Sequence, residues 1–465
     1  MLSGKRSGSY KIDMCSGPIV SRILLFTIPL ALSSILQLLF NAADVVVVGK
    51  YAGDDSLAAV GSVVPLINLL ISLFMGLSIG SNVLASRFCG SRDDLMLRRT
   101  VHTSVLVSFI SGLLLAVGGF IFARQMLILM DSPPETLPLA TLYLKIYFLG
   151  MPASMVYNFG SALMRAVGDT RRPMYYLTIA GIVNVILNLF FVISLKMDVA
   201  GVAIATVISQ IISAVLVIRC LMKEKGPLKL DLSALGVDRT ILVRIFAIGL
   251  PASFQGMLFS LSNVIIQTSV NSFGATVVAG NSAAMNIEGF VYMAMNAFYQ
   301  ACISFVSANV GARQYDRINR VLVRAQLCVV VTGMILGGSA YLSGNSLLSI
   351  YTDSPRVIEA GMIRLTYITL PYFLCGMMDV MVGALRGLGY AITPMIVSLI
   401  GACGLRLLWI FTFFRLPRFH ETKYLYVTYP VSWTVTFLAH VACYIIVKRR
   451  FDARHAAVAA DRHDD

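Results

Sequence analysis

Twelve long apolar runs dominate this sequence of 465 residues. Each run has about 20 residues or more, the length that an α-helix needs to cross a bilayer, and ends at charged or turn-forming residues. The strands of outer-membrane barrels would show shorter segments of alternating polarity. We therefore predict an all-α integral membrane protein with twelve transmembrane helices. The runs cover approximately residues 22–45, 58–85, 101–123, 139–164, 175–195, 200–221, 245–270, 279–308, 325–346, 364–385, 395–414 and 429–447.

The composition excludes several classes of soluble protein. Hydrophobic residues make up 57% of the chain and charged residues only 13%, whereas soluble domains carry about 25% charged residues. A cytosolic enzyme, a secreted domain and a disordered scaffold are thus excluded. The eight cysteines are scattered and form no CxxC motif, so we expect small buried apolar residues and neither disulfides nor a metal site. The polar start leads into an apolar run too long for a cleavable signal peptide.

The basic residues predict the orientation in the membrane. If both termini are inside, 27 of the 37 Lys and Arg residues fall on the inner side, about eight on the outer side and two within spans. Cytoplasmic loops are enriched in basic residues, so we expect a multi-pass plasma (inner) membrane protein with both termini in the cytoplasm. The net charge of +14 then reflects topology, and we expect no nucleic-acid partner.

An internal repeat divides the chain. Asp-Ser-Pro occurs at 131–133 and again at 353–355, about 221 residues later. The same offset relates further residues in order: Arg165, Gly168, Pro173 and Met174 match Arg386, Gly389, Pro394 and Met395. Six helices per half is an even number, so the halves have the same orientation, which is the parallel-repeat design of alternating-access transporters. We predict two six-helix bundles, residues 1–225 and 226–465.

Five ionisable residues lie within the predicted spans, and no catalytic motif accompanies them. A charged residue inside a membrane costs roughly 2.5 to 3.5 kcal/mol on insertion scales, so each is a functional candidate. The absence of nucleotide-binding and hydrolase motifs indicates that the protein is not an enzyme and has no cofactor, and that an ion gradient supplies the energy. The five residues are Asp44, Lys145, Glu288, Asp379 and Arg406.

Asp44 lies on one helix face with two amides. Gln37, Asn41 and Asp44 are spaced i, i+4 and i+7, which places them on the same side of the helix. Such a face suits a monovalent cation or a proton, although Asp44 could instead be an interfacial carboxylate. Amide and hydroxyl oxygens on the fifth and sixth helices are hard ligands that suit an alkali cation or hydrogen bonds between helices. They belong to Asn184, Asn188 and Thr206.

The chain resembles the multidrug and toxic compound extrusion (MATE) family of cation-coupled antiporters, prokaryotic type. The resemblance covers nearly the whole chain and rests on several segments together: the first helix from Pro29 to Asp44, Gly49, Ser-Leu-Ala-Ala-Val-Gly at 56–61, Arg-Ala-Val-Gly-Asp-Thr at 165–170 with Pro173, and Ala-Leu-Arg-Gly at 384–387. It implies export of cationic amphipathic drugs against Na⁺ or H⁺, with the ion held at positions matching Asp44, Asn184, Asn188 and Thr206. Many relatives carry a second acid where this chain has Asn188.

The second half offers candidates for binding substrate. Glu288, Tyr292, Met295 and Tyr299 form a helical stripe that suits an organic cation through charge, cation–π and adaptable apolar contacts; core packing is the alternative for the aromatic residues and Met295. Asp379 resembles an acid that some family members use for coupling or substrate, and could otherwise pair with Arg386 or Arg406. Asn263 and Gln267 repeat the amide face of the first helix.

These features predict a cation-coupled multidrug antiporter that works by alternating access. We expect small organic cations as substrates, Na⁺ or H⁺ as the coupling ion, the lipid bilayer as surroundings and a monomer as the working unit. A lipid-linked sugar flippase of the same superfamily is the alternative, disfavoured because the spans hold three acids and two bases. A membrane-embedded enzyme would need a nucleophile with a base, or a metal cluster, within the spans.

Overall fold

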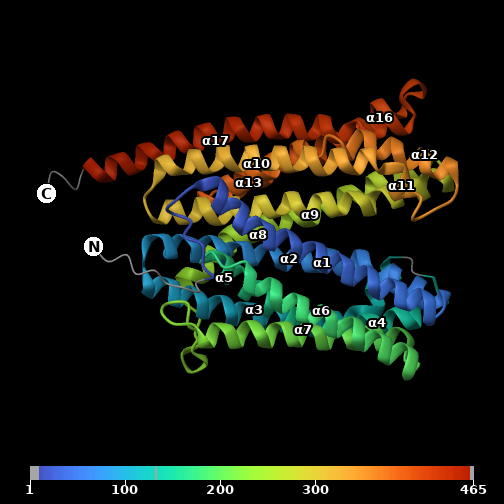
Figure 1. The fold of residues 1–465 in the computed structure, drawn as a ribbon, viewed down its shortest axis with the longest axis horizontal. Helices are drawn as coiled ribbons and strands as arrows, with labels where there is room; N and C mark the ends of the chain where they lie inside the picture. Colours follow the sequence, from blue (N-terminus) through green and yellow to red (C-terminus); the bar gives the residue numbers. More distant parts are fainter. Residues whose placement is uncertain (1–9, 131–132, 461–465) are drawn as a thin grey trace. The chain divides into compact units, whose positions relative to one another are not determined.

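The computed structural model describes residues 10–130 and 133–460. Over these ranges the chain is helical and has no β-strand. The motif predicted at 131–133 thus lies partly outside the described residues, as do the first nine and the last five residues of the chain. Figure 1 shows the helices coloured by their position in the sequence, from blue at the N-terminus to red at the C-terminus.

The twelve predicted spans are confirmed. Within the described chain, eleven helical segments are long and apolar enough to cross a membrane, and the bent pair α4 (Leu137–Leu149) and α5 (Met151–Ala166) makes the twelfth. The uninterrupted helices are α1 (Ile19–Tyr51), α2 (Asp54–Ser91), α3 (Asp94–Leu129), α6 (Arg171–Leu189), α7 (Asp198–Lys223), α8 (Arg239–Asn271), α9 (Ala275–Gly311) and α10 (Tyr315–Leu342).

The last three spans are interrupted. A π-helix, Leu365–Thr369, and a turn separate α12 (Pro355–Arg364) from α13 (Phe373–Gly387), and a second π-helix, Leu399–Gly404, separates α14 (Ile392–Ser398) from α15 (Leu405–Phe411). The final span combines α16 (Thr422–Tyr426) with α17 (Thr428–Ala460), while the short α11 (Gly344–Leu348) follows α10.

Gly150 and Pro152 account for the 47° bend between α4 and α5. Pro152 has no backbone N–H and cannot continue the hydrogen-bond ladder of α4. A Cβ atom on Gly150 would come within 2.3 Å of Oε1 of Gln210, so the missing side chain lets α7 approach the bend. The sequence predicts a single run over 139–164, and the structure adds a kink within it.

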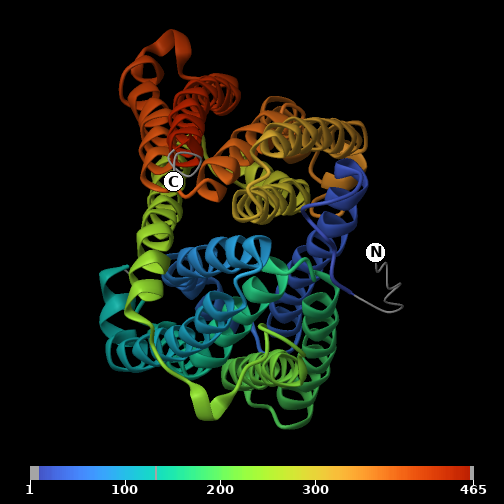
Figure 2. The ribbon, with the colours of Figure 1, turned by 90° about the vertical axis from the view of Figure 1, so that its left-hand side faces the viewer.

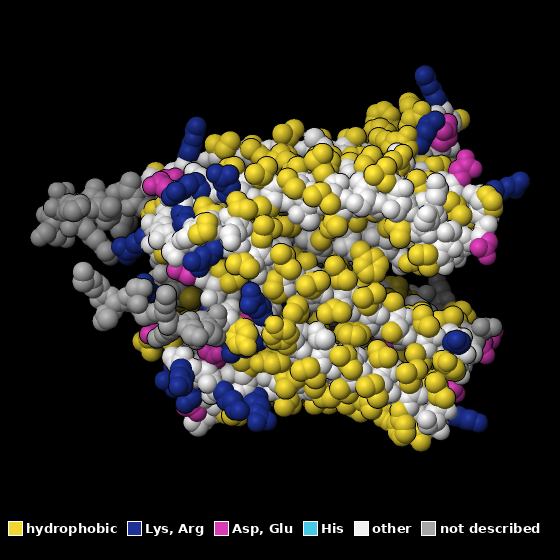
Figure 3. Space-filling view, in the orientation of Figure 1, with side chains coloured by type: hydrophobic (Ala, Val, Ile, Leu, Met, Phe, Trp, Pro, Cys, Tyr) yellow, Lys and Arg dark blue, Asp and Glu magenta, His cyan; other side chains and the backbone are white. Residues whose placement is uncertain are grey.

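The surface has the pattern of a protein embedded in lipid. Large apolar side chains are exposed along most of the spans, for example Leu114 and Ile186, which are 66% and 60% exposed. Figure 3 shows these side chains over the middle of the helices, with Lys and Arg side chains gathered toward the helix ends. This arrangement matches an apolar bilayer core between two polar interfaces.

The chain divides into two compact units that are interleaved in sequence. Unit 1 consists of Met1–Asp13 and Ile28–Ser253, and unit 2 consists of Met14–Thr27 and Phe254–Asp465. They differ from the predicted halves, 1–225 and 226–465, because α1 and α8 each contribute to both units. The start of α1 belongs with the C-terminal helices, and the first part of α8 belongs with the N-terminal ones.

Each unit is built around its own buried helices. In unit 1, α5 packs against α2, α3 and α7, with Met155 and Phe159 fully buried. In unit 2, α13 packs against α9, α10 and α17, and every residue from Val380 to Gly387 is buried. Figure 2, a view along the helices, shows α13 between α10 and α17.

The predicted repeat is visible in the backbone. Three pairs of residues with positive φ are each separated by 221 positions: Gly53 and Gly274, Arg92 and Arg313, and Gly168 and Gly389. The φ angles within each pair agree closely, for example 55° at Arg92 and 57° at Arg313. Because a left-handed conformation is uncommon outside glycine, the Arg pair is strong evidence that both sets of helices descend from one six-helix pattern.

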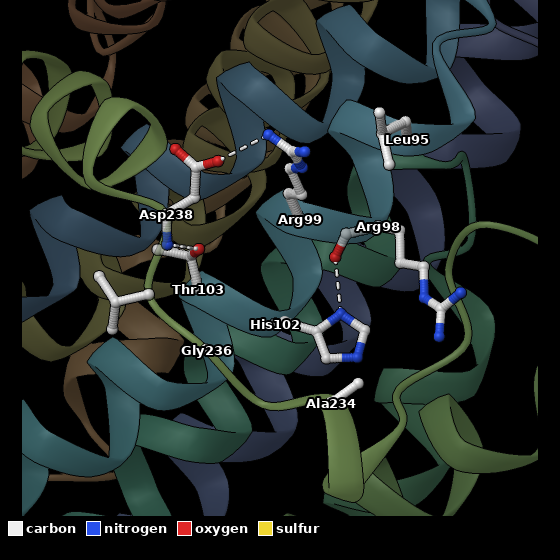
Figure 4. A pocket seen from close by; sticks show the side chains of 9 residues that line it. Leu95, Arg98, Arg99, His102, Thr103, Ala234, Gly236 and Asp238 are labelled. Atoms are coloured by element: carbon white, nitrogen blue, oxygen red, sulfur yellow. Dashed lines mark hydrogen bonds and ion pairs between the residues drawn. The ribbon is translucent and has the colours of Figure 1, made fainter.

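The segment between α7 and α8 is held against the start of α3. His102 is 4% exposed and its Nε2 accepts the backbone N–H of Asp231 at 3.2 Å, while the N–H of Asp238 donates to Oγ1 of Thr103 at 3.1 Å. Arg99 also pairs with Asp238 at 3.2 Å. Figure 4 shows the two contacts of Asp238, with Arg99 and Thr103, around a pocket at this end of unit 1. The linker is therefore part of the folded unit.

Candidate ion-coupling site

Asp44 lies late in α1 and reaches side chains of two other helices of unit 1. Asn188 of α6 donates a short hydrogen bond from Nδ2 to Oδ1 of Asp44. The same amide group lies 3.3 Å from Oδ1 of Asn184, and Nδ2 of Asn184 lies 3.5 Å from Oγ1 of Thr206 on α7. The structure thus brings together all four residues of the predicted ion site, from three helices.

Close packing of α1 on α6 positions this cluster. Gly181 has no side chain, and the ring of Phe40 occupies the space beside it: a Cβ on Gly181 would meet the Phe40 ring at 1.9 Å. Asp44 follows Phe40 by one helical turn, and Asn188 follows Gly181 by about two turns. The contact between Phe40 and Gly181 therefore sets the distance at which Asp44 meets Asn188.

The cluster is polar and has no cationic partner. Among the described residues, Asp44 forms no ion pair, because none of the eight ion pairs includes it. Lys145, the only basic residue predicted within the spans of unit 1, lies over the ring of Phe120 at 5.1 Å. A carboxylate surrounded by amide and hydroxyl oxygens suits a hard monovalent cation or a proton.

Asn188 supplies a further oxygen. Its side chain is fully buried, and its Oδ1 atom has no hydrogen-bond partner in the described part of the chain. A buried oxygen without a partner is costly, so this atom fits the donor set of an alkali cation better than it fits a purely structural role. The described residues contain no group of three or more His, Cys, Asp or Glu that could hold a metal, so a cation here would use amide and hydroxyl oxygens beside one carboxylate.

Two tyrosines near Asp44 were missed at the sequence level. Tyr143 and Tyr147 of α4 stack with their ring centroids 6.0 Å apart, and they pack in the same apolar cluster as Val47 and Val48, which follow Asp44 by about one turn of α1. Their i, i+4 spacing within a predicted span is the sequence signal that could have identified them. Gln37 and Asn41, by contrast, are exposed on α1 and make no hydrogen bond to the cluster.

The carboxylate of Glu288 in unit 2 forms an ion pair with Arg364. Nη2 and Nε of Arg364 donate to Oε2 of Glu288 at 2.7 and 3.0 Å, and Nη1 donates to Asn281 at 2.8 Å. The hydroxyl of Tyr426 donates to the same Asn281 oxygen at 3.0 Å. Because Arg364 is only 4% exposed, Glu288 is half of a buried ion pair.

The other predicted substrate residues of unit 2 fall into different environments. Gln267 accepts a hydrogen bond from Asn281 at 3.2 Å and so joins the network around Arg364, whereas Asn263 is exposed. The ring of Tyr292 packs edge-on against Tyr372, with centroids 6.3 Å apart. Tyr299 is buried and accepts a short hydrogen bond from Arg386.

Asp379 of α13 has no ion pair. The two arginines considered for it have other partners: Arg386 also donates to Gln255 at 2.8 Å, and Arg406 donates to Ser432 at 2.8 Å and stacks on Tyr429 at 4.1 Å. No described residue forms an ion pair or hydrogen bond with the Asp379 carboxylate. It is partly exposed.

The count of charges within the spans needs correction. Arg364 and Arg386, assigned to loops from the sequence, lie buried within the span Pro355–Gly387. The apolar runs alone placed the two residues at or beyond the ends of that helix. Adding these two buried arginines to the five ionisable residues predicted within the spans gives three acids and four bases, so the excess of acids used against a flippase no longer holds.

The spans and the repeated helical pattern define a multi-pass membrane protein of a duplicated transporter type. The chain belongs to the MatE family: the MatE model matches residues 29–190 and again residues 251–412. The two matched segments correspond to the two repeats, and each begins within a helix shared by both units, α1 or α8.

Individual relatives agree with this assignment. "Probable multidrug resistance protein YoeA" of Bacillus subtilis is 29% identical over 92% of this chain and 93% of the relative. "FAD transporter" of Shewanella oneidensis is 23% identical over 94% and 96%. A solved structure of the outward-facing conformation of a multidrug resistance MATE family transporter has a TM-score of 0.88 at 20% identity, covering 96% of this chain and all of that one. At that identity the likeness shows the fold.

Proposed function

We propose that this protein is an antiporter of the plasma membrane that exports organic cations in exchange for Na⁺ or H⁺ and catalyses no chemical reaction. The observation that carries the proposal is the cluster of Asp44, Asn184, Asn188 and Thr206. A single carboxylate among neutral oxygens can neutralise one monovalent ion. The names of the relatives support an export role, and the excess of basic residues on one side supports cytoplasmic termini.

Coupling follows because Asp44 has two states. In one its charged carboxylate accepts a hydrogen bond from Asn188, and in the other a cation or proton neutralises it. In the outward-facing state the carboxylate takes up one cation, with Oδ1 of Asn188 as a second oxygen ligand. Loss of the carboxylate charge weakens the bond that Asn188 donates to it, because hydrogen bonds to charged groups are stronger than those to neutral ones. The contact between α1 and α6 changes, and substrate is released outside. A one-for-one exchange with a monovalent organic cation moves no net charge, so the concentration gradient of the ion drives it: each tenfold gradient supplies about 1.4 kcal/mol, enough for tenfold accumulation by a monomer.

Transport of ethidium into inverted vesicles tests the proposal. Vesicles containing the wild-type chain are given an imposed Na⁺ gradient or an imposed pH gradient, and dye uptake is recorded. We expect one gradient to drive uptake and Asp44→Asn to abolish it. Asp55→Asn is the matched control, because Asp55 is exposed on α2. Full gradient-driven uptake by Asp44→Asn would overturn the proposed site.

An anionic substrate is the second candidate. Arg386 and Arg406 of unit 2 are buried without an acidic partner among the described residues, and one relative is named as a transporter of FAD, an anion. Measuring the uptake of an anionic fluorescein derivative by the same vesicles decides between a cationic and an anionic substrate. Gradient-driven uptake of this dye without uptake of ethidium would favour the anion.

A further inference from the structure

We propose that a basic pocket at the start of α10 binds the phosphate group of an anionic phospholipid. The pocket has a volume of about 360 Å³ and lies within unit 2, between residues 17–20 at the start of α1 and the first turns of α10. Three arginines of α10 line it: Arg317, Arg320 and Arg324. Nothing in the coupling mechanism uses these residues.

The helical geometry directs the arginines to one place. Their spacing of i, i+3 and i+7 places them on the same face of α10, and side chains on a helix lean toward its N-terminal end, so Arg324 reaches back toward Arg320. Arg317 fixes the opposite wall, because its Nη2 donates to the carbonyl oxygens of Ser16 and Gly17 at 2.7 and 2.9 Å.

The start of α1 adds to the positive potential. The first backbone N–H groups of α1 have no partner within the helix, and they lie beside the pocket wall at Ile19 and Val20. The guanidinium group of Arg22 lies against Gly17, since a Cβ on this glycine would be 2.8 Å from Nε of Arg22. An anion in the pocket would therefore face several guanidinium groups and a helix N-terminus.

Two of the three arginines that line the pocket have no acidic partner in the described chain. None of the lining residues is acidic, and in the described chain neither Arg320 nor Arg324 forms an ion pair or a hydrogen bond. Asp316, at the first turn of α10, forms no ion pair with them either. The arginines beside the pocket of Figure 4 are different: Arg99 pairs with Asp238 at 3.2 Å, and Arg98 lies 3.7 Å from Asp231, which the figure does not draw. Both pockets hold arginines, and Arg320 and Arg324 lack the acidic partners that Arg98 and Arg99 have in the described chain.

The surroundings identify a lipid as the source of the phosphate. Arg324 lies about 14 Å along α10 from its first residue, at 1.5 Å per residue. Beside it, Val323 and Leu327 are 63% and 53% exposed, and they continue the apolar surface that faces the acyl chains. Arg324 directly precedes the apolar run predicted from residue 325, so its side chain lies near the level of the lipid headgroups, where a phospholipid presents a phosphate with acyl chains beside it.

Native mass spectrometry of the purified full-length chain tests the proposal. The protein in detergent is titrated with phosphatidylglycerol or with zwitterionic phosphatidylcholine, and bound lipids are counted. We expect one phosphatidylglycerol to be retained preferentially, and the double variant Arg320→Gln with Arg324→Gln to bind it about 30-fold more weakly, since each basic residue near an anionic lipid contributes about fivefold. Arg98→Gln with Arg99→Gln, the same change in the compensated pocket, should bind like wild type.

A Lys variant and competition by inorganic phosphate distinguish a lipid site from a folding defect and from a site for free anions. Replacing Arg320 and Arg324 by Lys keeps the charge and should restore most of the binding, which shows that a folding defect is not the cause. Equal loss of binding in the control pair would overturn the site, as would unchanged binding in the Gln variant. Displacement of the lipid by inorganic phosphate at a similar concentration would show a free-anion site and overturn the assignment to a lipid.

Discussion

Asn188 donates its amide hydrogen to the Asp44 carboxylate while its own Oδ1 atom is buried without a partner in the described chain. One side chain thus both restrains the acid and offers an oxygen beside it. An amide can do both at once, whereas an ionised carboxylate at this position could only accept. The position therefore decides how many negative charges the site holds.

Asn188→Asp should change the ion dependence of transport. Two neighbouring carboxylates do not both ionise freely, so the variant should bind one more proton or cation than the wild type before it releases substrate. We expect the pH at which ethidium uptake is half-maximal to rise by about one unit. A pH series of vesicle uptake measures this shift. An unchanged profile would mean that residue 188 lies outside the titrating site.

Gly181→Ala should displace Asp44. The added Cβ would collide with the Phe40 ring, and overpacking of this kind typically costs about 1 to 3 kcal/mol. We expect a lower midpoint of thermal unfolding and reduced gradient-driven uptake. Gly118→Ala is the matched control, because a Cβ there meets nothing within 4 Å. If both variants behave alike, the contact between α1 and α6 does not determine the position of Asp44.

Arg364→Met should destabilise unit 2 strongly. It leaves Glu288 without its donor and removes one of the two hydrogen bonds that Oδ1 of Asn281 accepts, and breaking a buried pair typically costs about 3 to 5 kcal/mol. The double variant Glu288→Met with Arg364→Met should recover most of the thermal stability, because it leaves no lone charge. If this double variant still exports ethidium, Glu288 is not a substrate residue; a double variant no more stable than Arg364→Met would contradict the coupling.

Glu224→Gln should weaken a charge cluster at the end of α7. Burial raises the pKa of Glu224, but the hydrogen bonds from Lys11 and Arg172, both at 2.6 Å, outweigh it and leave the pKa below its usual value. A depressed pKa stabilises the fold above the unfolded value of 4.5, and this contribution is lost as the pH falls through the folded value. Replacement should therefore cost about 2 kcal/mol at pH 7.

Thermal unfolding at pH 7 and below pH 4.5 checks this pH dependence. The difference between wild type and Glu224→Gln should shrink as the pH falls. Glu421→Gln removes an exposed pair with Lys423, which is worth little, and should change the midpoint by much less at either pH. Equal effects of the two substitutions would contradict a special role for the cluster.

The sequence predicts the membrane fold well because long apolar runs are local signals. The family resemblance also implies that Asp44, Asn184, Asn188 and Thr206 meet. Helical spacing by itself groups Asp44 with Gln37 and Asn41, which are exposed. The pairing of Glu288 with Arg364 could not be predicted, because 76 residues separate them and helix packing alone brings them together. Likewise, Phe40 against Gly181 is a contact of shape, and neither residue stands out in the sequence.

The interleaving of the two units has a consequence for biosynthesis. The carbonyl oxygen of Met14 accepts a hydrogen bond from Asn309 at 3.1 Å, and Phe26 packs edge-on against Phe305. At 5 to 20 residues per second, the ribosome needs roughly 15 to 60 seconds to make the intervening chain. The first segment to enter the membrane thus waits for α9 before it can dock, and a nascent chain released before that point leaves this segment without its native neighbours.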